Sequence, residues 1–337
     1  MNEKILITGG CGFIGSNFIR SLLNHRQNIS IINLDVLTYA GNIDNLRDVR
    51  KDKRYRFVRG DITNGLVVGR LLKKGVDAIV NFAAESHVDR SLYNPAVFLK
   101  TNILGTQCLL ESAIKYKIPR FIQISTDEVY GSLGPKEPAF TENHPLQPSS
   151  PYSASKAAAD LLVKAYETTF GYKAIIVRSS NNYGPYQFPE KVIPLFITNA
   201  FENKSLPLYG DGKNVRDWLY VEDNCAAIDL VLRKGQPGEI YNIGGQCEKM
   251  NLEITGTILN KLGKPESLIQ YVKDRPGHDR RYALNISKIK RELGWQPKYK
   301  FEEGLRKTIQ WYLENRDWWQ RIKTGEYLKF CRRHYGK

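Results

Sequence analysis

The sequence of 337 residues lacks the features that identify several classes of protein. No apolar run approaches the ~20 residues that a membrane span requires, so no membrane association is expected. The five cysteines are scattered and form no C-x-x-C pair, which argues against a disulfide framework and against a metal site. The first residues form no charged-then-apolar leader, and we therefore expect a cytoplasmic protein. No linker rich in glycine or serine and no internal repeat divides the chain.

The formal net charge of +15 raises the question of nucleic-acid binding. Much of this charge comes from residues 47–56 and from the tail, residues 316–337, where Trp318, Trp319 and Phe330 alternate with basic residues. Such a tail resembles a platform for single strands, but no recognition motif accompanies it. We favour a C-terminal helix that packs its aromatic side chains on the body. Nucleic acid is not expected as a partner, and a positive field also suits a polyanionic small substrate.

The first 180 residues alternate between strand-like and helix-like segments. Apolar runs typical of strands lie at residues 4–8, 29–35, 55–60, 78–84, 120–125 and 173–179. Helical patterns lie between several of them, at residues 13–24, 95–116 and 151–170. Strands that are buried on both faces and joined by helices are typical of a parallel doubly wound sheet. The sequence therefore predicts an α/β fold with a Rossmann-like sheet.

After residue 181 the elements become shorter and mixed, and proline, glycine and tyrosine become frequent. Residues 221–233 have a helical pattern and residues 239–243 a strand pattern, so the chain is expected to return to the sheet. We predict a Rossmann domain over residues 1–180 with a returning segment at about 215–245. A smaller, mixed α/β, discontinuous substrate-binding region is predicted over residues 181–337, with a cleft between the two.

A glycine-rich turn follows the first predicted strand and opens the first helix. Gly9, Gly12 and Gly15 allow a tight turn, a close approach of the backbone to a pyrophosphate, and close packing of helix on strand. The N-terminus of the helix then receives the phosphate charge. Asp35 ends the second strand, where a carboxylate accepts hydrogen bonds from ribose hydroxyls, and no basic residue directly follows it. These features predict a site for NAD rather than NADP.

Two further strand ends are placed to contact the cofactor. Asp61 ends the third strand, and we expect it either beside the adenine or as the cap of the next helix. Residues 81–84 end the fourth strand with small side chains, which suit a backbone that passes close under the cofactor.

Tyr152 and Lys156 lie four residues apart, a spacing that places both side chains on one face of a helix. A lysine beside a tyrosine favours the phenolate, so we expect a lowered phenol pKa and proton transfer from an alcohol. Thr126, Asp127 and Glu128 follow a predicted strand, where a loop cap with a solvated neighbour is the common alternative. Oxidation of an alcohol needs no such acid pair, so these carboxylates indicate further chemistry.

With these motifs the chain resembles the extended short-chain dehydrogenase/reductases, and among them most closely the dTDP-glucose 4,6-dehydratases. The resemblance extends from Lys4 to about Trp319, and the tail beyond departs from it. The stretches that carry it lie at residues 83–91, 125–131, 180–191, 214–218 and 275–282.

The resemblance implies oxidation of dTDP-glucose at C4, loss of water between C5 and C6, and return of the hydride to C6, with NAD regenerated. Tyr152 would remove the C4 hydroxyl proton and Lys156 would hold the ribose. Thr126 would hydrogen-bond the C4 oxygen. Glu128 would be the base at C5, and Asp127, which we predict to be protonated in the working complex, the acid at the C6 hydroxyl.

The resemblance also implies a set of binding residues. Cofactor contacts are expected from Gly9, Gly12, Phe13, Ile14, Gly15, Asp35, Leu37, Thr38, Asp61, Ile62, Phe82, Ala83, Ala84, Ser86, Thr101, Tyr152, Lys156 and Asn182. Substrate contacts are expected from Ser86, Thr126, Asn181, Lys191, Val192, Pro207, Tyr209, Arg216, Asn251, Arg275 and His278.

Some of these roles have alternatives. Arg216 suits a diphosphate because a guanidinium offers paired donors, but an ion pair with Asp217 would also explain it. His278 follows a Pro-Gly turn and could be an ordinary loop histidine. The family pairs two subunits through helices that match residues 95–116 and 151–170, so a homodimer is implied.

Three functions compete. A 4,6-dehydratase uses all of the residues Tyr152, Lys156, Asp127 and Glu128. An epimerase or decarboxylase acting on a UDP-sugar has no need of the acid pair, and a UDP-sugar 4,6-dehydratase would differ only in its base contacts. A non-catalytic protein that senses NAD or binds nucleic acid has no need of any of the four. The sequence favours dehydration and leaves the choice between thymidine and uridine open.

Overall fold

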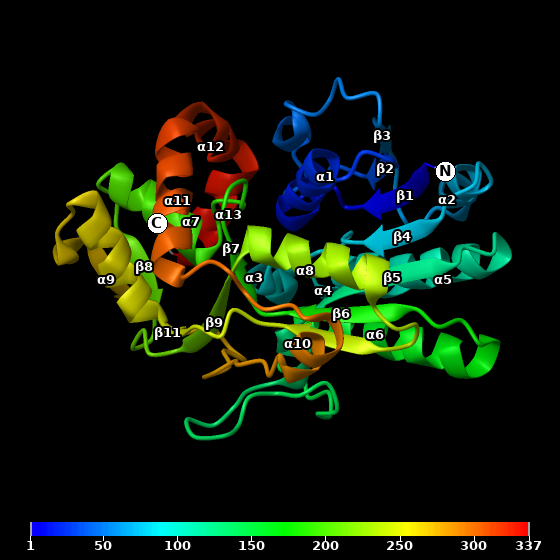
Figure 1. Ribbon diagram of the computed structural model, residues 1–337. Coiled ribbons are helices and arrows are strands. Elements are labelled where there is room, and N and C mark those ends of the chain that lie inside the picture. Colours follow the sequence, from blue (N-terminus) through cyan, green and yellow to red (C-terminus); the bar gives the residue numbers. More distant parts are fainter. Residues whose placement is uncertain (1, 336–337) are drawn as a thin grey trace.

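Seven parallel strands form the sheet that carries the predicted dinucleotide turn (Figure 1). The computed structural model describes residues 2–335; Met1 and residues 336–337, the outer ends of the two predicted domains, lie outside the described residues. The spatial order is β3-β2-β1-β4-β5-β6-β10, and each neighbouring pair is parallel. The predicted Rossmann-like fold is confirmed, and the order reverses beside β1, where such sheets bind dinucleotides. The strands are β1 (Glu3–Thr8), β2 (Ile29–Asp35), β3 (Tyr55–Arg59), β4 (Ala78–Asn81), β5 (Arg120–Thr126), β6 (Ile175–Ser179) and β10 (Ile240–Ile243).

Helices cover both faces of the sheet because its strands are apolar on both sides. In β1, Ile5 and Ile7 belong to one core and Leu6 to the other. The first core is covered by α1 (Phe13–His25), α8 (Val221–Lys234) and α10 (Ser287–Leu293). The second is covered by α2 (Gly65–Leu72), α5 (Gly105–Lys115) and α6 (Pro151–Phe170).

Short elements connect the larger ones. The helix predicted for residues 95–116 is a continuous stretch of α4 (Pro95–Phe98), η2 (Leu99–Leu104) and α5, of which η2 is a π-helix. The remaining short elements are η1 (Ile43–Leu46), α3 (Val88–Tyr93), η3 (Asp127–Tyr130) and η4 (Glu266–Leu268). Within residues 2–335, no helix combines the length and the apolar character that crossing a bilayer requires.

The helix that carries Tyr152 and Lys156, α6, has clear local signals at both ends. The Ser150 side chain accepts a hydrogen bond from the backbone N–H of Ser153 (3.1 Å), and Pro151 occupies the first helical position. Gly171 ends the helix with φ +69°, a left-handed conformation that glycine adopts without strain. The helix therefore begins at the residue before Tyr152 whatever its tertiary contacts are.

A buried ion pair ties α6 to the sheet. Asp160 lies one turn after Lys156, and its Oδ2 accepts hydrogen bonds from Arg178 Nε of β6 (2.9 Å) and Ser125 Oγ of β5 (3.0 Å). The Arg178 guanidinium also donates to Tyr130 Oη (2.8 Å), which donates to Asn242 Oδ1 of β10 (2.8 Å). One network therefore joins α6, three strands of the sheet and η3.

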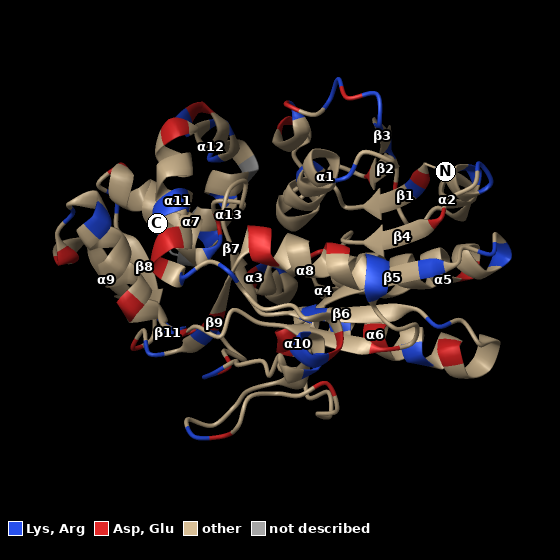
Figure 2. Cartoon of the chain, viewed as in Figure 1, with Lys and Arg blue, Asp and Glu red and all other residues tan. Residues whose placement is uncertain are grey.

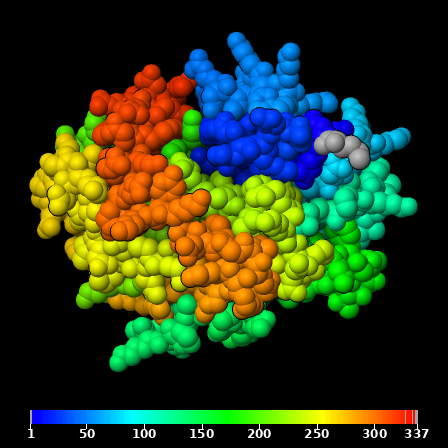
Figure 3. Space-filling view, in the orientation of Figure 1, coloured from blue at the N-terminus to red at the C-terminus, as the bar shows by residue number. Residues whose placement is uncertain are grey.

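The C-terminal part of the chain builds a second, smaller core beside the sheet. Three short strands form one sheet, in which β9 (Val215–Tyr220) lies between β7 (Asn181–Tyr183) and β11 (Glu248–Met250). Two further strands, β8 (Leu206–Tyr209) and β12 (Ile269–Val272), pair with each other. Tyr183, Phe196, Trp218, Leu305 and Trp319 are among its buried residues. The space-filling view shows the orange and red C-terminal segments lying directly against the blue and green N-terminal ones (Figure 3). The helices are α7 (Val192–Phe201), α9 (Asn251–Leu262), α11 (Phe301–Glu314), α12 (Arg316–Ile322) and α13 (Gly325–Tyr335).

The tail aromatics pack inward, as the favoured interpretation of the sequence predicts. Trp318, Trp319 and Tyr327 are buried, and the Trp318 indole N–H donates to Asn45 Oδ1 (2.9 Å). Phe330 is half-buried against the body. Lysine and arginine residues lie on many elements of the cartoon, with aspartate and glutamate residues between them (Figure 2). Among the tail side chains that the structure describes, no row of stacking aromatics is therefore presented to a nucleic acid.

Replacing Arg178 by methionine tests the network beneath α6. Both side chains of the Arg178–Asp160 pair are almost fully buried. Loss of the guanidinium leaves an uncompensated carboxylate, so we expect the free energy of unfolding to fall by about 3–5 kcal/mol. Urea denaturation followed by circular dichroism measures the change. The control, Arg306→Met, removes an exposed arginine of α11 and should change stability by less than about 0.5 kcal/mol. Equal stability of the two variants would contradict the prediction.

Candidate active site

The glycine turn between β1 and α1 has the geometry that a dinucleotide requires. Gly9 has φ +68°, and a Cβ atom there would lie 2.6 Å from the Cα atom of Ala83. Only glycine fits this position, because the turn passes directly over the end of β4. The helix α1 begins at Phe13, so its N-terminus points at the space above the turn.

A cavity of about 390 Å³ opens over this turn, and nearly all predicted cofactor residues line it. Leu37 and Asn182 do not line it. Leu37 has φ +59° and packs against the core beneath the sheet edge, whereas the Asn182 side chain donates to the carbonyl of Ser180 (2.9 Å). The residues that line it are Gly9, Gly12, Phe13, Ile14, Gly15, Asp35, Thr38, Asp61, Ile62, Phe82, Ala83, Ala84, Ser86, Thr101, Tyr152 and Lys156.

Two of the predicted cofactor residues, Asp35 and Asp61, bring carboxylates to the wall of this cavity. Asp35 accepts hydrogen bonds from the backbone N–H groups of Cys11 (2.9 Å) and Leu37 (2.8 Å), which fix the carboxylate at the cavity wall. Asp61 accepts from Thr63 N–H (2.9 Å). The cap of α2 is Asn64, so the alternative role of Asp61 as that cap is wrong. The glycine turn and Asp35 fit an NAD-type cofactor.

Tyr152 and Lys156 point from α6 to the floor of this cavity. The Lys156 ammonium donates to the carbonyl of Ile124 (2.6 Å), and its burial lowers the lysine pKa to about 8. The expected lowering of the phenol pKa is wrong for the protein without ligands. Burial, followed by the nearby charge of Glu128, raises the pKa of Tyr152 well above its ordinary value, and only a hydrogen bond with Thr126 opposes this effect.

The acid pair begins η3, directly after β5. The Thr126 hydroxyl donates to Asp127 Oδ1 (3.1 Å) and accepts from the backbone N–H of Glu128 (3.2 Å). Burial and the neighbouring Glu128 raise the pKa of Asp127 well above its usual range. Burial also raises the pKa of Glu128, but Arg275, Lys191 and Arg216 oppose the rise. The direction for Asp127 is the one that a general acid requires.

A second cavity of about 130 Å³ adjoins the first and contains Glu128 in its wall. Glu190 and Lys191 line both cavities, so the two form one connected site. Ser86 lines only the first cavity and Thr126 lines neither. All other predicted substrate residues line the second cavity, namely Asn181, Lys191, Val192, Pro207, Tyr209, Arg216, Asn251, Arg275 and His278.

The donors and acceptors of this second cavity are only partly used by the protein. Asn181 Oδ1, Asn251 Oδ1 and Arg275 Nε are buried without a hydrogen-bond partner among the described residues. Buried polar atoms are normally paired, so these three atoms fit a polar ligand. Arg216 donates to the carbonyl oxygens of Val215 (2.8 Å) and Asp279 (3.0 Å).

The contacts of Arg216 argue against its alternative role, whereas the contact of His278 fits either of its two predicted roles. Asp217 turns away from Arg216 and accepts from the backbone N–H of Cys247 (2.8 Å), so the predicted alternative ion pair is absent from the described part of the chain. Arg216 instead stacks over the Tyr282 ring at 4.2 Å. The His278 Nδ1 atom lies 2.6 Å from Asp274 Oδ1, which holds the ring at the cavity wall.

Several lining residues were not singled out from the sequence. His87, Asp89 and Tyr282 line the second cavity. They belong to stretches that carry the family resemblance, which is the signal that points to them. Tyr39 and Lys100 line the first cavity, and no sequence motif marks them.

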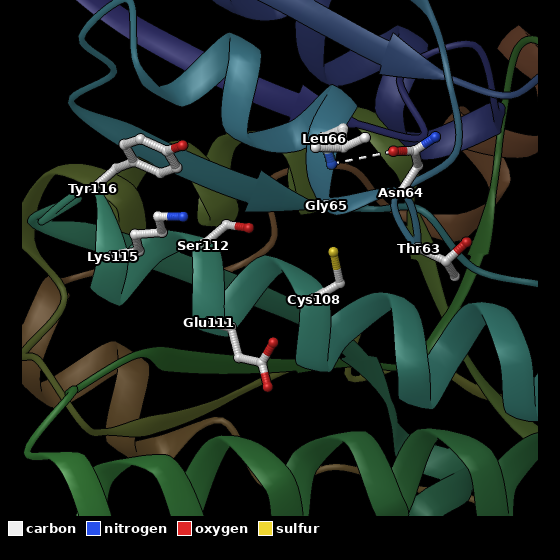
Figure 4. Close-up of a pocket in the computed structure, with 9 residues that line it drawn as sticks. All are labelled: Thr63, Asn64, Gly65, Leu66, Cys108, Glu111, Ser112, Lys115 and Tyr116. Carbon is white, nitrogen blue, oxygen red and sulfur yellow. Dashed lines mark hydrogen bonds between the residues drawn. The ribbon is translucent and has the colours of Figure 1, made fainter.

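A groove of about 700 Å³ lies elsewhere, between α2 and α5 (Figure 4). Its side chains include Cys108, Glu111 and Lys115, and Asn64 caps α2 through Leu66 N–H at 3.1 Å. In Figure 4 the Glu111 carboxylate points away from Cys108 and Lys115. The groove is larger than either cavity of the site, but it brings no catalytic set together.

A parallel sheet with a glycine turn, and a tyrosine and lysine on the helix beside it, define a short-chain dehydrogenase/reductase. The family model described as GDP-mannose 4,6 dehydratase matches residues 6–308, and the chain belongs to this family.

The relatives confirm the narrower resemblance found in the motifs. A dTDP-glucose 4,6-dehydratase of Escherichia coli is 50% identical in a match that covers 96% of this chain and 97% of the relative. The crystal structure of a dTDP-glucose 4,6-dehydratase from Streptomyces venezuelae, with NAD and a second ligand bound, has a TM-score of 0.93 and 52% identity; the match covers 95% of this chain and 100% of that one. A UDP-glucose 4-epimerase from Thermotoga maritima has a TM-score of 0.85 at 30% identity, over 92% of this chain and 99% of that one.

Lys156→Met separates the chemical role of the lysine from its effect on stability. The lysine pKa of about 8 in the folded protein lies below the ordinary 10.5. Below pH 8 both states carry the proton, and the folded state bears a penalty of about 3 kcal/mol. Above pH 8 the folded protein loses the proton first, so this penalty fades as the pH rises. We expect the variant to be inactive but more stable at pH 7 by up to about 3 kcal/mol.

Urea denaturation of cofactor-free protein between pH 7 and pH 10 measures this difference, which should narrow as the pH rises. Lys261→Met, at an exposed position of α9, is the control and should stay within about 0.5 kcal/mol of the parent protein. A stability difference that does not change with pH would contradict the assigned cause.

Proposed function

We propose that this chain is a nucleotide-sugar dehydratase that converts dTDP-glucose to dTDP-4-keto-6-deoxyglucose and water. The observation that carries the proposal is the placement of the acid pair. Asp127 and Glu128 begin η3 beside Tyr152, and Glu128 belongs to the wall of the cavity that adjoins the cofactor cavity. An alcohol dehydrogenase or an epimerase needs Tyr152 and Lys156 but has no use for two buried carboxylates at this position.

Oxidation at C4 is the first step. When bound, NAD accepts a hydride from C4 and later returns it to C6. The Tyr152 oxygen takes the proton of the C4 hydroxyl as a phenolate. Because burial raises the pKa of Tyr152 in the protein without ligands, this phenolate needs the positive charge of Lys156 to stabilise it. Thr126, which hydrogen-bonds Tyr152, is placed to orient the C4 oxygen. Lys156 supplies positive charge on the same face of α6 and holds the ribose.

Elimination follows because the C4 ketone acidifies the C5 hydrogen. Glu128 removes this proton, and the electron pair of the C5–H bond forms the C5–C6 double bond. The C6–O bond breaks as Asp127 donates its proton, so the C6 hydroxyl leaves as water. Hydride then adds to C6 and Glu128 returns its proton to C5. The proton that Tyr152 took from the C4 hydroxyl replaces the one that Asp127 lost, so atoms and charges balance.

The diphosphate of the substrate is proposed to lie between Arg216, Arg275 and Lys191. All three cations line the second cavity, where Arg216 is buried and Lys191 and Arg275 are half-buried, and desolvation lowers the pKa of Lys191 and of Arg216. A buried cation gains most from an anionic ligand, because it otherwise lacks a full set of partners. Asn181 and Asn251 supply the acceptors and donors for the rest of the nucleotide.

A second candidate is the same chemistry, or epimerisation, on a UDP-sugar. The support is the fold itself, which a UDP-glucose 4-epimerase shares at 30% identity. The acid pair argues against epimerisation but does not distinguish uridine from thymidine. The proposed thymidine preference rests on relatives that are about 50% identical over nearly the whole chain.

Incubation with dTDP-glucose tests the proposal. We expect a product lighter by one water in mass spectrometry, a 4-keto group in a chemical test, and no net NADH. UDP-glucose in a parallel reaction should turn over at least about tenfold more slowly, since base discrimination of that size needs only about 1.4 kcal/mol. An isobaric epimer as the product would overturn the proposal.

The variant Glu128→Gln separates the two half-reactions in the same assay. Oxidation needs no base at C5, so NADH absorbance should accumulate at one equivalent per site while dehydration stops. Glu142→Gln, at a carboxylate outside both cavities, is the matched control and should keep dehydration. Unchanged dehydration in Glu128→Gln would remove Glu128 from its role.

We also propose that the protein is a homodimer built on the helical stretch at residues 95–104 and on α6. These adjoining elements expose several large apolar side chains, including Leu99, Leu104 and Leu161, which is 60% exposed. Contiguous apolar surface of this kind marks interaction sites.

We also propose the division into a cofactor domain (residues 1–180 with about 215–245) and a substrate region, and a cytoplasmic location. All five cysteines are free of disulfides, which fits a reducing compartment.

Leu104→Glu combined with Leu161→Glu tests the dimer. Two charges on each partner would be buried without counterions, so we expect the double variant to be a monomer in light scattering while its circular dichroism stays unchanged. Leu66→Glu, at a leucine of α2 that is 79% exposed, is the control and should remain dimeric. A parent protein that is already monomeric, or a double variant that still dimerises, would contradict the proposed interface.

A further inference from the structure

The last helix, α13, lies beyond the residues that the family model matches and has no part in the proposed chemistry. It nevertheless reaches the wall of the substrate cavity. Tyr327 donates from its hydroxyl to the carbonyl of Pro189 (2.9 Å), directly before Glu190 and Lys191. The stretch that links the two cavities therefore packs against α13.

Phe330, in the middle of α13, packs against α3 and against His87, the residue before α3. The Arg90 guanidinium lies over the Phe330 ring at 4.2 Å, and the His87 ring meets its edge at 5.6 Å. Arg90 in turn donates to Glu190 Oε2 (3.0 Å). These contacts fix α3 relative to α13, and α3 carries Asp89.

His334 inserts from the end of α13 among the residues of the substrate cavity. Its Nδ1 lies 3.1 Å from Tyr93 Oη, and its ring stacks on Phe330 with the ring centroids 5.3 Å apart. Its Nε2 hydrogen-bonds Tyr209 Oη and lies 3.3 Å from Asp89 Oδ2. The imidazole is almost fully buried.

Asp89 connects His334 with two residues that are predicted to bind the substrate. Its Oδ1 accepts from the Arg275 guanidinium (3.0 Å), and its Oδ2 accepts from Tyr209 Oη (3.1 Å). Burial would raise the pKa of Asp89, but the hydrogen bond with His334 and the charges of His87 and Arg275 hold it well below its usual range. Asp89 is thus a carboxylate that orients Arg275 and Tyr209 together.

We propose that His334 is a positioning residue for the nucleoside diphosphate half of the substrate. Through Asp89 and Tyr209 it sets the direction of the Arg275 guanidinium, whose Nε is free of hydrogen-bond partners among the described residues and is available to the ligand. The inference rests on the proposed function, since it assigns the second cavity to a nucleoside diphosphate. It predicts an effect on binding rather than on the chemical step, because the contacts of His334 described above are with Tyr209, Asp89, Tyr93 and Phe330, which have no part in the proposed chemical step.

The variant His334→Ala tests the inference, with dTDP alone as the probe. Removal of one hydrogen bond to a buried carboxylate should raise the Kd of dTDP, measured by titration calorimetry, about tenfold. The KM for dTDP-glucose should rise by a similar factor, while kcat and the Kd of NAD stay within about twofold. The variant His334→Gln carries an amide nitrogen that reaches the place of Nε2, and it should restore most of the affinity. Leu328→Ala, at an exposed position of α13, should bind dTDP as the parent protein does.

The outcomes separate the inference from the function on which it rests. An unchanged Kd of dTDP in His334→Ala, or a loss of kcat at unchanged KM, would overturn the inference. Equal losses in the alanine and glutamine variants would reduce His334 to a packing role and overturn it as well. If His334→Ala does not fold, Phe330→Ala, which undocks α13 from α3, should raise the Kd of dTDP by a similar factor. Failure of the parent protein to bind dTDP would instead overturn the proposed function.

Discussion

The ion pair between Asp160 and Arg178 is the constraint on which the geometry of the site depends. Asp160 belongs to the same helix face as Tyr152 and Lys156, and Ser125, which also binds Asp160, directly precedes Thr126, Asp127 and Glu128. One carboxylate therefore fixes the helix with the oxidising pair against the strand that ends in the acid pair. A buried pair of this kind gains little stability over an apolar one, but its hydrogen bonds allow only one register. Reaction at C4 and at C5–C6 of one sugar needs that fixed distance.

Burial then sets the charges of the site. The same desolvation raises the pKa of Asp127, Glu128 and Tyr152 and lowers that of Lys156. Glu128 differs from Asp127 because Arg275, Lys191 and Arg216 favour its ionised form, whereas Glu128 itself opposes ionisation of Asp127. Two adjacent carboxylates thus acquire different proton affinities from their neighbours alone. The cations that would bind a diphosphate also favour the ionised form of Glu128, the proposed base. Substrate recognition and acid–base chemistry therefore depend on the same charges.

The sequence predicts the sheet, α6 and most lining residues because these follow from local pattern and motif. Strands buried on both faces are recognisable in the sequence as apolar runs, and Ser150-Pro151 marks the start of α6. The phenol pKa of Tyr152 was predicted in the wrong direction, because spacing reveals the neighbouring lysine but not the depth of burial or the facing Glu128. The alternative prediction that Asp61 caps the next helix is wrong for a local reason, because Asn64 caps that helix, α2. Tyr39 and Lys100 could not be found, because only the folding of separate segments, a loop and η2, brings them to the cavity.

The two halves of the site are built in different ways. Tyr152, Lys156, Asp127 and Glu128 come from two adjacent helical elements, α6 and η3, and their arrangement is settled once both elements pack against the sheet. The nucleotide end joins Asp89, Tyr209, Arg275 and His334 from four distant parts of the chain through a single carboxylate. Such a cluster is complete only when α13 packs against α3. The proposed chemistry therefore rests on elements packed against the sheet, whereas selection of the nucleotide depends on contacts between distant segments. Arg275 belongs to the nucleotide cluster and also favours the ionised form of Glu128, so a change in α13 would reach the proposed base through that arginine.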